Sequence, residues 1–235
     1  MILKIISVGF FSGITVLSGG MLSNYFNHHL KESPVKEEIN HTLMSFGAGI
    51  ILSALALVLI PKGLNRLDLI PVSISFLSGT FIFMIIDRYL EKKGGKRSAL
   101  LAMMMDFVPE SIALGAVFAV DHKMALLLAV FIGLQNLPES FNSFRDLVLS
   151  GFTPRKTLTV FFFLSFFGVF GTLIGYVFLR DYPDITAYLM TFSGGGILYL
   201  LIQDIIPASK MDKHYLVSVG ASLGFWIGII GKKLI

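Results

Sequence analysis

The sequence predicts an all-α membrane protein with eight transmembrane helices. Of the 235 residues, 54% are hydrophobic and 14% are charged, whereas an average soluble domain carries about 25% charged residues. The mean hydropathy is +0.78. A helix needs about 20 mostly apolar residues to span a bilayer. Segments of this kind cover residues 3–26, 41–61, 69–90, 98–120, 123–148, 157–179, 185–208 and 213–231.

Short polar links join these segments. Each segment is therefore taken to end where its apolar run meets the polar residues of a link. The first could be a signal peptide, but its apolar character continues to Phe26 and no convincing cleavage site follows. The longest polar links, residues 27–40 and 91–97, separate the first segment from the second and the third from the fourth. The second and seventh segments end at Ile60-Pro61 and Ile206-Pro207. No soluble domain fits between the helices, so residues 1–235 are expected to form a single transmembrane domain.

The basic residues indicate how the helices are oriented in the cell membrane. Loops and helix ends on one side carry 12 lysines and arginines, and those on the other side carry 7. The positive-inside rule places the richer side in the cytoplasm, so both termini are predicted outside. Lys232 and Lys233 run against this orientation. Because basic residues sit in loops, the formal charge of +4 does not indicate a nucleic-acid partner. The absence of cysteine excludes disulfides and thiolate metal sites.

Two segments of the chain are similar in sequence. Met44-Ser45-Phe46 and Met190-Thr191-Phe192 each lead, with the same spacing, to an Ile-Pro pair, Ile60-Pro61 or Ile206-Pro207. On the predicted orientation the two helices run in opposite directions, so helices 1–3 and 6–8 are expected to form an inverted repeat around helices 4 and 5. This 3+2+3 bundle is typical of secondary transporters. The alternative is that both segments are merely glycine-containing apolar helices that end at proline.

A short polar motif occurs twice, on the predicted helices four and five. The first copy is Asp106-Phe107-Val108-Pro109-Glu110-Ser111, and the second is Gln135-Asn136-Leu137-Pro138-Glu139-Ser140. A carboxylate inside an apolar helix costs about 2.5–3.5 kcal/mol on insertion scales. Because the chain carries such unfavourable carboxylates in two copies of one motif, the motif is expected to have a function.

The spacing of the motif predicts how its polar residues face one another. Asp106 and Glu110 are four residues apart and share one helix face, as do Gln135 and Glu139. Because the two helices are expected to be antiparallel, Asp106 should lie level with Glu139, and Glu110 with Gln135. The two levels differ by roughly 6 Å. Pro109 and Pro138 are expected to kink the helices beside this group.

These four side chains are candidate ligands for a divalent cation. Two alternatives are that the acids pair with basic residues or that they are protonated. No lysine or arginine lies in the central part of any predicted helix, which argues against the first alternative. Three carboxylates and one amide suit Mn²⁺, Mg²⁺ or Fe²⁺, and hold Zn²⁺ or Co²⁺ less selectively.

Taken together, these features resemble the ZIP family of divalent metal transporters, in a divergent prokaryotic-type form. The paired proline motifs, the helix count, the outside termini and the glycine-rich helices two and seven carry the resemblance over nearly the whole chain. It implies uptake of Zn²⁺ or a related cation into the cytoplasm, with a metal site at Asp106, Glu110, Gln135 and Glu139. It also implies a homodimer in the lipid bilayer. No enzymatic activity is expected, and no cofactor beyond the transported cation.

The chain departs from the family pattern at several positions. Asp106 stands where histidine is usual, and Phe107 replaces a metal-binding asparagine. Gly168 aligns with a glutamate that bridges two metals in many relatives. These differences predict one metal position rather than two. Gln203-Asp204 stands where relatives often have His-Glu.

Several alternatives stay open at this point. Asp204, Asp87, Asn142 and Asp146 could form an exit path for a cation, or they could be solvated residues at helix ends. The sequence does not decide whether Asn136 or Gln203 contributes to such a path. The transporter could select Mn²⁺ or Fe²⁺, or the chain could be a relative that only senses metal. An intramembrane aspartyl protease also needs two carboxylates, but the Gly-x-Gly-Asp motif of that class is absent.

Overall fold

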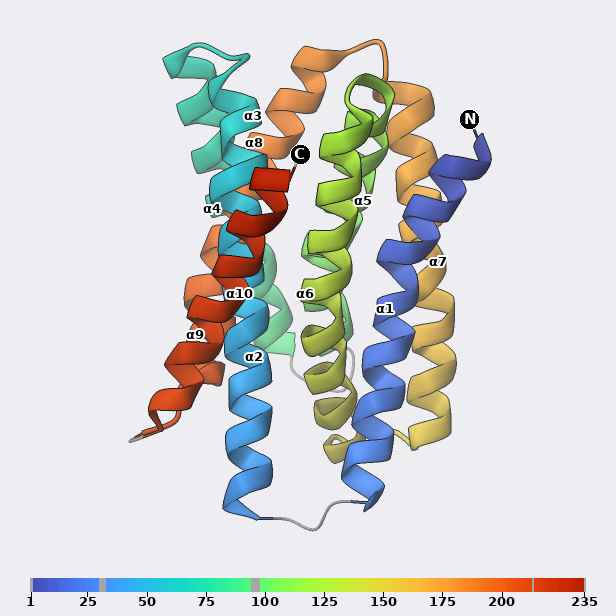
Figure 1. Ribbon diagram of the computed structural model, residues 1–235, viewed down its shortest axis with the longest axis vertical. Helices are drawn as coiled ribbons and strands as arrows, with labels where there is room; N and C mark the ends of the chain where they lie inside the picture. Colours follow the sequence, from blue (N-terminus) through green and yellow to red (C-terminus); the bar gives the residue numbers. More distant parts are fainter. Residues whose placement is uncertain (1, 30–32, 94–97, 213, 235) are drawn as a thin grey trace.

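The computed structural model describes residues 2–29, 33–93, 98–212 and 214–234 (Figure 1). All regular secondary structure within these ranges is helical. Two π-helical segments, η1 (Leu55–Leu59) and η2 (Leu201–Ile205), join α2 to α3 and α8 to α9. The α-helices are α1 (Ile2–His29), α2 (Pro34–Ala54), α3 (Ile60–Leu64), α4 (Leu69–Lys93), α5 (Ser98–Val120), α6 (His122–Leu149), α7 (Pro154–Leu179), α8 (Pro183–Leu200), α9 (Ile206–Ser209) and α10 (Tyr215–Leu234).

Eight helical rods in the described part of the chain are long and apolar enough to cross a membrane. This confirms the predicted fold class and helix count. The rods are α1, α2 with η1 and α3, α4, α5, α6, α7, α8 with η2 and α9, and α10.

The predicted link at residues 27–40 was too long. α1 continues to His29, and α2 begins at Pro34. The hydroxyl of Ser33 accepts a hydrogen bond from the backbone N–H of Lys36 at 3.2 Å, and the fixed φ of Pro34 suits the first helical position. A capped start explains why the charged residues of this link are helical. α4 ends at Lys93 and so extends into the predicted link at 91–97. Residues 94–97 lie outside the described ranges.

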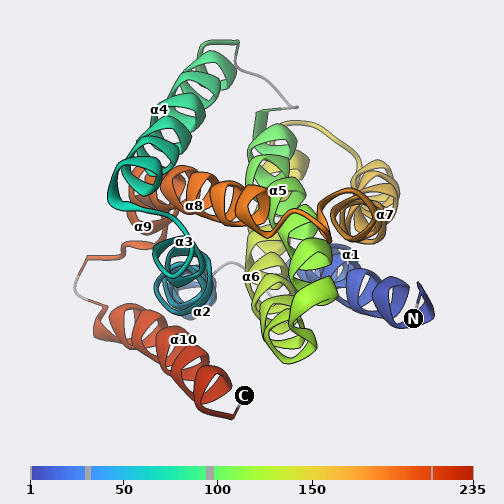
Figure 2. The ribbon, with the colours of Figure 1, turned by 90° about the horizontal axis from the view of Figure 1, so that it is seen from above.

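The eight rods form two groups (Figure 2). In one group α1 packs against α6 and α7, and α5 packs against α6 and α7. In the other, α2 packs against α10 and α4 against α8. Contacts of α6 with α2 and of α5 with α8 join the groups. The pair α5 and α6, which carries the polar motifs, therefore lies where the groups meet.

The two π-helical segments have the same local geometry. Each precedes an Ile-Pro pair, and in each the isoleucine N–H donates across a widened turn, from Ile60 to the Leu55 carbonyl and from Ile206 to the Leu201 carbonyl. A proline cannot donate to the turn before it, which favours such local rearrangement. This likeness agrees with the similarity between the two segments, whereas the inverted arrangement of helices 1–3 and 6–8 stays a prediction.

Glycine lets α1 approach α7 closely. A Cβ atom on Gly13 would lie 2.0 Å from the carbonyl oxygen of Ser165, and one on Gly168 would lie 2.5 Å from the carbonyl oxygen of Gly9. Small residues of this kind allow backbone contact between membrane helices. The contact holds α1 and α7 against the outer side of the α5–α6 pair.

We expect Gly13→Ala to destabilise the protein by about 1–3 kcal/mol, because the added methyl group overlaps a backbone atom that cannot move freely. The matched control is Gly194→Ala on α8, where a Cβ atom would lie 3.4 Å from its nearest neighbour, in the Ile60 side chain. Unfolding of the two variants in lipid nanodiscs measures the difference. Equal stability of both variants would contradict the close α1–α7 contact.

Candidate metal centre

The two polar motifs lie on neighbouring helices at the centre of the bundle. α5 and α6 continue through Pro109 and Pro138, and the two helices pack against each other (Figure 1). Asp106, Glu110 and Gln135 are buried, and Glu139 is partly buried. These side chains reach their positions because a spacing of four residues places each pair on one helix face.

Glu110 and Gln135 are joined directly. The side-chain Nε2 of Gln135 donates a hydrogen bond to Oε2 of Glu110, at 2.5 Å. This contact occurs at the level that the antiparallel arrangement predicts. The carboxyl group of Asp106 lies within electrostatic reach of both Glu110 and Glu139.

A cavity of about 240 Å³ opens beside this group. Asp106, Gln135 and Glu139 line it, whereas Glu110 contributes only through its bond to Gln135. The Oδ1 atom of Asp106 accepts a hydrogen bond from the backbone N–H of Phe107 at 2.8 Å. The structure therefore brings all four candidate ligands to one place, three on the cavity wall and one behind it.

Two oxygen atoms of this group have no hydrogen-bond partner among the described residues. They are Oε1 of Gln135 and Oε2 of Glu139, and both are buried. A buried polar oxygen without a partner is unfavourable by about 1–3 kcal/mol. Both residues line the cavity, so a cation there could satisfy both oxygens.

The acids have no basic partner in the described part of the chain. The ion pairs found there lie in loops and at helix ends, and none includes Asp106, Glu110 or Glu139. The same residues contain no group of three histidine or acidic side chains that already converges on a metal position. The ligands therefore lie around the cavity without forming a closed coordination shell.

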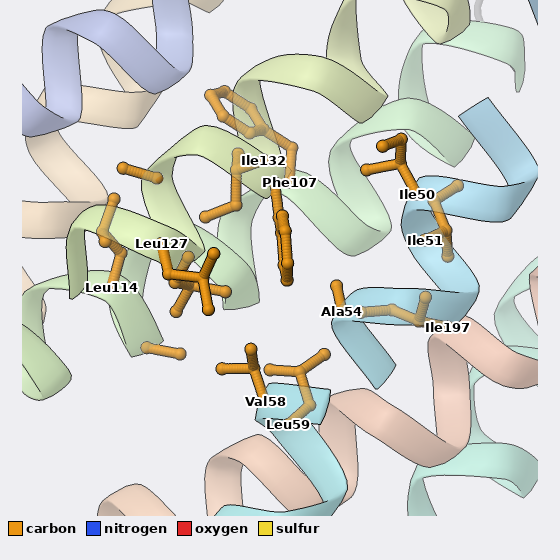
Figure 3. Packing of buried hydrophobic residues seen from close by; sticks show 14 of the residues in the cluster. Ile50, Ile51, Ala54, Val58, Leu59, Phe107, Leu114, Leu127, Ile132 and Ile197 are labelled. Atoms are coloured by element: carbon orange, nitrogen blue, oxygen red, sulfur yellow. The ribbon is translucent and has the colours of Figure 1, made fainter. Parts of the chain in front are cut away.

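Phe107, Asn136 and Gly168 are the positions considered for a second metal, and each makes contacts with other parts of the bundle. Phe107 is fully buried in an apolar cluster (Figure 3). The side-chain Nδ2 of Asn136 donates to the carbonyl of Ser12 on α1 at 3.1 Å, while its Oδ1 is buried without a hydrogen-bond partner among the described residues. A side chain at Gly168 would overlap Gly9 of α1. Each of these three positions thus contributes to packing.

The proposed exit residues fall into two sets. Asn142, Asp146 and Asp204 line the same cavity as Asp106 and Glu139. Asp87 and Gln203 do not line it, and Asp87 accepts a hydrogen bond from the hydroxyl of Tyr199 at 2.8 Å.

Sequence reasoning missed one wall of the cavity. It is formed by residues of α2 and of the α8–α9 rod, namely Met44, Gly47, Ala48, Ile51, Leu200, Ile205 and Ala208. Gly47 approaches Pro138 so closely that a Cβ atom would lie 2.6 Å from the proline ring. The glycine-rich segment before Pro61 was a usable signal, because glycine in a helix often marks a close approach.

The fold and this site define an integral membrane protein: its described residues form eight helices long and apolar enough to cross a membrane, and a carboxylate-lined cavity lies between α2, α5, α6 and the α8–α9 rod. The chain belongs to the ZIP zinc transporter family, whose family model matches residues 96–231, more than half of the chain. The resemblance expected from the sequence is thereby confirmed.

Curated relatives match a smaller part of the chain. It is 28% identical to mouse zinc transporter ZIP13 over 114 residues, which cover 46% of this chain and 30% of the relative. It is 28% identical to zinc transporter zipt-7.1 of Caenorhabditis briggsae over 122 residues, covering 48% of this chain and 30% of that protein. With zebrafish (Danio rerio) ZIP13 it shares 24% identity over 110 residues, 46% of this chain and 32% of the relative. The matched region therefore spans about a third of the length of these relatives.

We expect Gln135→Leu to destabilise the metal-free protein by about 1–3 kcal/mol, because it leaves the buried Glu110 carboxyl group without its donor. Gln203→Leu is the matched control, since Gln203 is exposed and lies outside the cavity. Unfolding in the presence of a metal chelator measures both variants. An unchanged free energy of unfolding for Gln135→Leu would argue against the importance of this contact.

Proposed function

We propose that the protein carries a divalent metal cation, with Zn²⁺ as first choice, across the membrane into the cytoplasm. The cation binds at a single site between α5 and α6, formed by Asp106, Glu110, Gln135 and Glu139. The observation that supports this most strongly is the pair of unpartnered buried oxygens on Gln135 and Glu139, which line a cavity together with Asp106. Family membership supports metal transport independently.

The chemistry of the site favours a cation that has lost part of its hydration shell. Asp106 and Glu139 supply negative charge at the cavity wall, and Gln135 supplies a neutral oxygen. Glu110 is held by the amide of Gln135. Rotation of that amide would free the Glu110 carboxylate and allow all four side chains to approach one ion. In this proposal the coordination shell is completed only when the cation binds, because the Gln135 amide must first release the Glu110 carboxylate.

The direction of transport is inferred from the shape of the cavity and the loop charges. Along α6 the lining runs from Gln135 to Asp146, and it includes Ala208 of α9. These helix ends lie on the side with more lysine and arginine, which the positive-inside rule assigns to the cytoplasm. The cavity thus gives the site an opening towards the cytoplasm, as expected for one state of an alternating-access cycle.

Zn²⁺ is preferred because the relatives are zinc transporters by name. The ligand set alone favours Mn²⁺ or Fe²⁺, since it offers only oxygen atoms. Selectivity for those ions is the second candidate function. A homodimer in the bilayer is also part of the proposal, and the apolar residues exposed on the outer helices allow either lipid or a second copy to cover them.

Glu139→Gln is expected to lower uptake at least about tenfold, because the amide cannot supply the charge that favours a partly dehydrated cation over water, and a tenfold change corresponds to about 1.4 kcal/mol. Glu110→Gln should act in the same direction. Uptake of ⁶⁵Zn²⁺ into proteoliposomes, compared with Mn²⁺, Fe²⁺ and Co²⁺, measures the effect. The matched control is Glu91→Gln, an exposed acid on α4.

Normal uptake by both the Glu139→Gln and the Glu110→Gln variants would contradict the proposed metal site. Metal bound by the wild-type protein without any flux would instead favour a sensing relative. Cleavage of a membrane peptide by the protein, lost in the same variants, would favour a protease.

Two acids of the cavity lie nearer than Glu139 to the predicted cytoplasmic end, and we propose that they carry the released cation towards the cytoplasm. Asp146 and Asp204 line the cavity beyond Glu139, and Asn142 lies between Glu139 and Asp146 on α6. The double variant Asp146→Asn with Asp204→Asn should lower the maximal uptake rate severalfold while leaving equilibrium zinc binding at the main site nearly unchanged. Binding calorimetry and uptake kinetics on the same preparation separate the two quantities.

The control for this prediction is Asp212→Asn, in an exposed side chain outside the cavity. An unchanged maximal rate in the double variant would show that these acids are merely solvated residues at helix ends.

A further inference from the structure

We propose that a proton-sensitive clamp holds the start of α2 against the end of α9, at the end of the bundle that is predicted to face the cytoplasm, and that it regulates release of the cation. The clamp consists of two contacts, His214 with Glu38 and His41 with Ser209. Its effect on release rests on the proposed transport function. The clamp itself does not, because it is a contact between helices that can be measured without metal.

The two contacts join residues that are far apart in the chain. Nδ1 of His214, in the link between α9 and α10, lies 3.2 Å from Oε1 of Glu38 on α2. Nδ1 of His41, three residues further along α2, lies 3.2 Å from the carbonyl oxygen of Ser209, the last residue of α9. A carbonyl oxygen can only accept a hydrogen bond, so Nδ1 of His41 must carry the hydrogen. Together the contacts fasten α2 to the chain that follows α8.

The clamp lies next to the wall of the cavity. Met44, three residues after His41, lines the cavity, and so does Ala208, which directly precedes Ser209. The clamp therefore connects the two parts of the chain that form this wall near the predicted cytoplasmic end. A loosened clamp would let the wall open there and would ease the release of a cation.

A second ion pair joins the same two helical rods at their other ends. Arg66, in the link after α3, pairs with Asp184, the second residue of α8. Glu38 and Asp184 each lie six residues before the methionine of the two similar segments, Met44 or Met190. Figure 1 shows α3 beside α8 near the upper end of the bundle and α9 beside α2 lower down. Acids at matching positions thus tie the α2 and α8 rods at both ends.

The bases of the two ion pairs differ in how they respond to pH. Arginine stays charged at every pH that a cell encounters, whereas histidine gains or loses its charge near about pH 6.5. Glutamate and aspartate are ionised throughout this range. The His214–Glu38 pair is therefore complete in acid and loses its attraction as the pH rises, while the Arg66–Asp184 pair persists. The bond from His41 survives in both states, because a neutral imidazole can still donate.

The surroundings favour a response of this pair. It is the least exposed of the ion pairs between described residues, with 32% of the His214 side chain and 27% of the Glu38 side chain exposed. Partly buried charges are screened less by salt than exposed ones. Lys210 and Asp212, in the same link, are highly exposed and pair with each other at 3.9 Å. The remaining charged or titratable groups described in the adjoining elements are Lys36, Glu37 and His41 on α2, Asp204 on η2 and Tyr215 on α10.

Distances between spin labels test the clamp in the absence of metal. The chain has no cysteine, so cysteines at the exposed positions Val35, on α2, and Leu216, on α10, can carry the two labels. Double electron–electron resonance should give a narrow distance distribution at about pH 5.5 and a broader one, shifted to longer distances, at about pH 8. Labels at the exposed Leu64 and Ile185, beside the Arg66–Asp184 pair, should give the same distribution at both pH values.

Exchanging the bases between the two ion pairs makes the test specific. His214→Arg should keep the distribution narrow at both pH values, because the charge is permanent. Glu38→Gln should leave it broad at both. Arg66→His should confer pH dependence on the labels at Leu64 and Ile185. His28→Arg, at an exposed histidine on α1 outside the clamp, is the matched control and should keep the pH dependence of the unsubstituted protein.

Uptake kinetics test the consequence for release. In right-side-out vesicles at constant outer pH, lowering the inner pH from about 8 to about 5.5 should lower the maximal uptake rate severalfold. His214→Arg should be slow at both pH values, and Glu38→Gln should be fast at both. This comparison separates the clamp from protonation of the metal ligands, which would slow all three proteins alike.

Distances that do not change with pH in the unsubstituted protein would overturn the clamp, as would a pH dependence that survives His214→Arg. Equal pH dependence of uptake in all three proteins would overturn its role in release. Absence of uptake in the unsubstituted protein, with the expected distances, would instead refute the proposed transport function and leave the clamp standing.

Discussion

The structure depends on one electrostatic constraint, which is that three carboxyl groups lie inside a membrane-spanning bundle without a basic partner among the described residues. A charged group at such depth is costly unless water, a counter-ion or hydrogen bonds compensate it. Here Gln135 satisfies one oxygen of Glu110, and the N–H of Phe107 satisfies one of Asp106. Glu139 keeps a buried oxygen without a partner. The cavity beside α5 and α6 is the space in which a cation could complete this compensation.

Helix packing provides the frame that keeps these acids together. Glycine contacts between α1 and α7 hold one group of helices closely, and the approach of Gly47 to Pro138 brings α2 against the middle of α6. The bundle is therefore closed by apolar and backbone contacts, and three of the candidate ligands, Asp106, Gln135 and Glu139, line one cavity within it. The cavity is polar towards one end of the bundle, whereas the apolar cluster around Phe107 occupies the other direction.

Much of this could be predicted because helical periodicity is a local property. The length of apolar runs predicted the eight membrane helices, and the spacing of four residues predicted that Glu110 would face Gln135. The helix ends were less accurate, since capping by Ser33 and Pro34 extends helical structure into a charged segment that composition alone assigns to a loop. The inverted repeat and the single metal position stay predictions, although the matching π-helical segments agree with the first and the packing at Gly168 agrees with the second.

The sequence by itself determined which side chains could act as ligands and at which level of the membrane they lie, because both follow from residue type and from the rise of a helix. Only the tertiary structure decided which surface closes the site. The wall from α2 and α8, the engagement of Asn136 with Ser12 and the insertion of the Phe107 ring towards Ala54 all join residues far apart in the chain. Such contacts arise when helices pack, and their geometry depends on many side chains at once, which no local pattern encodes.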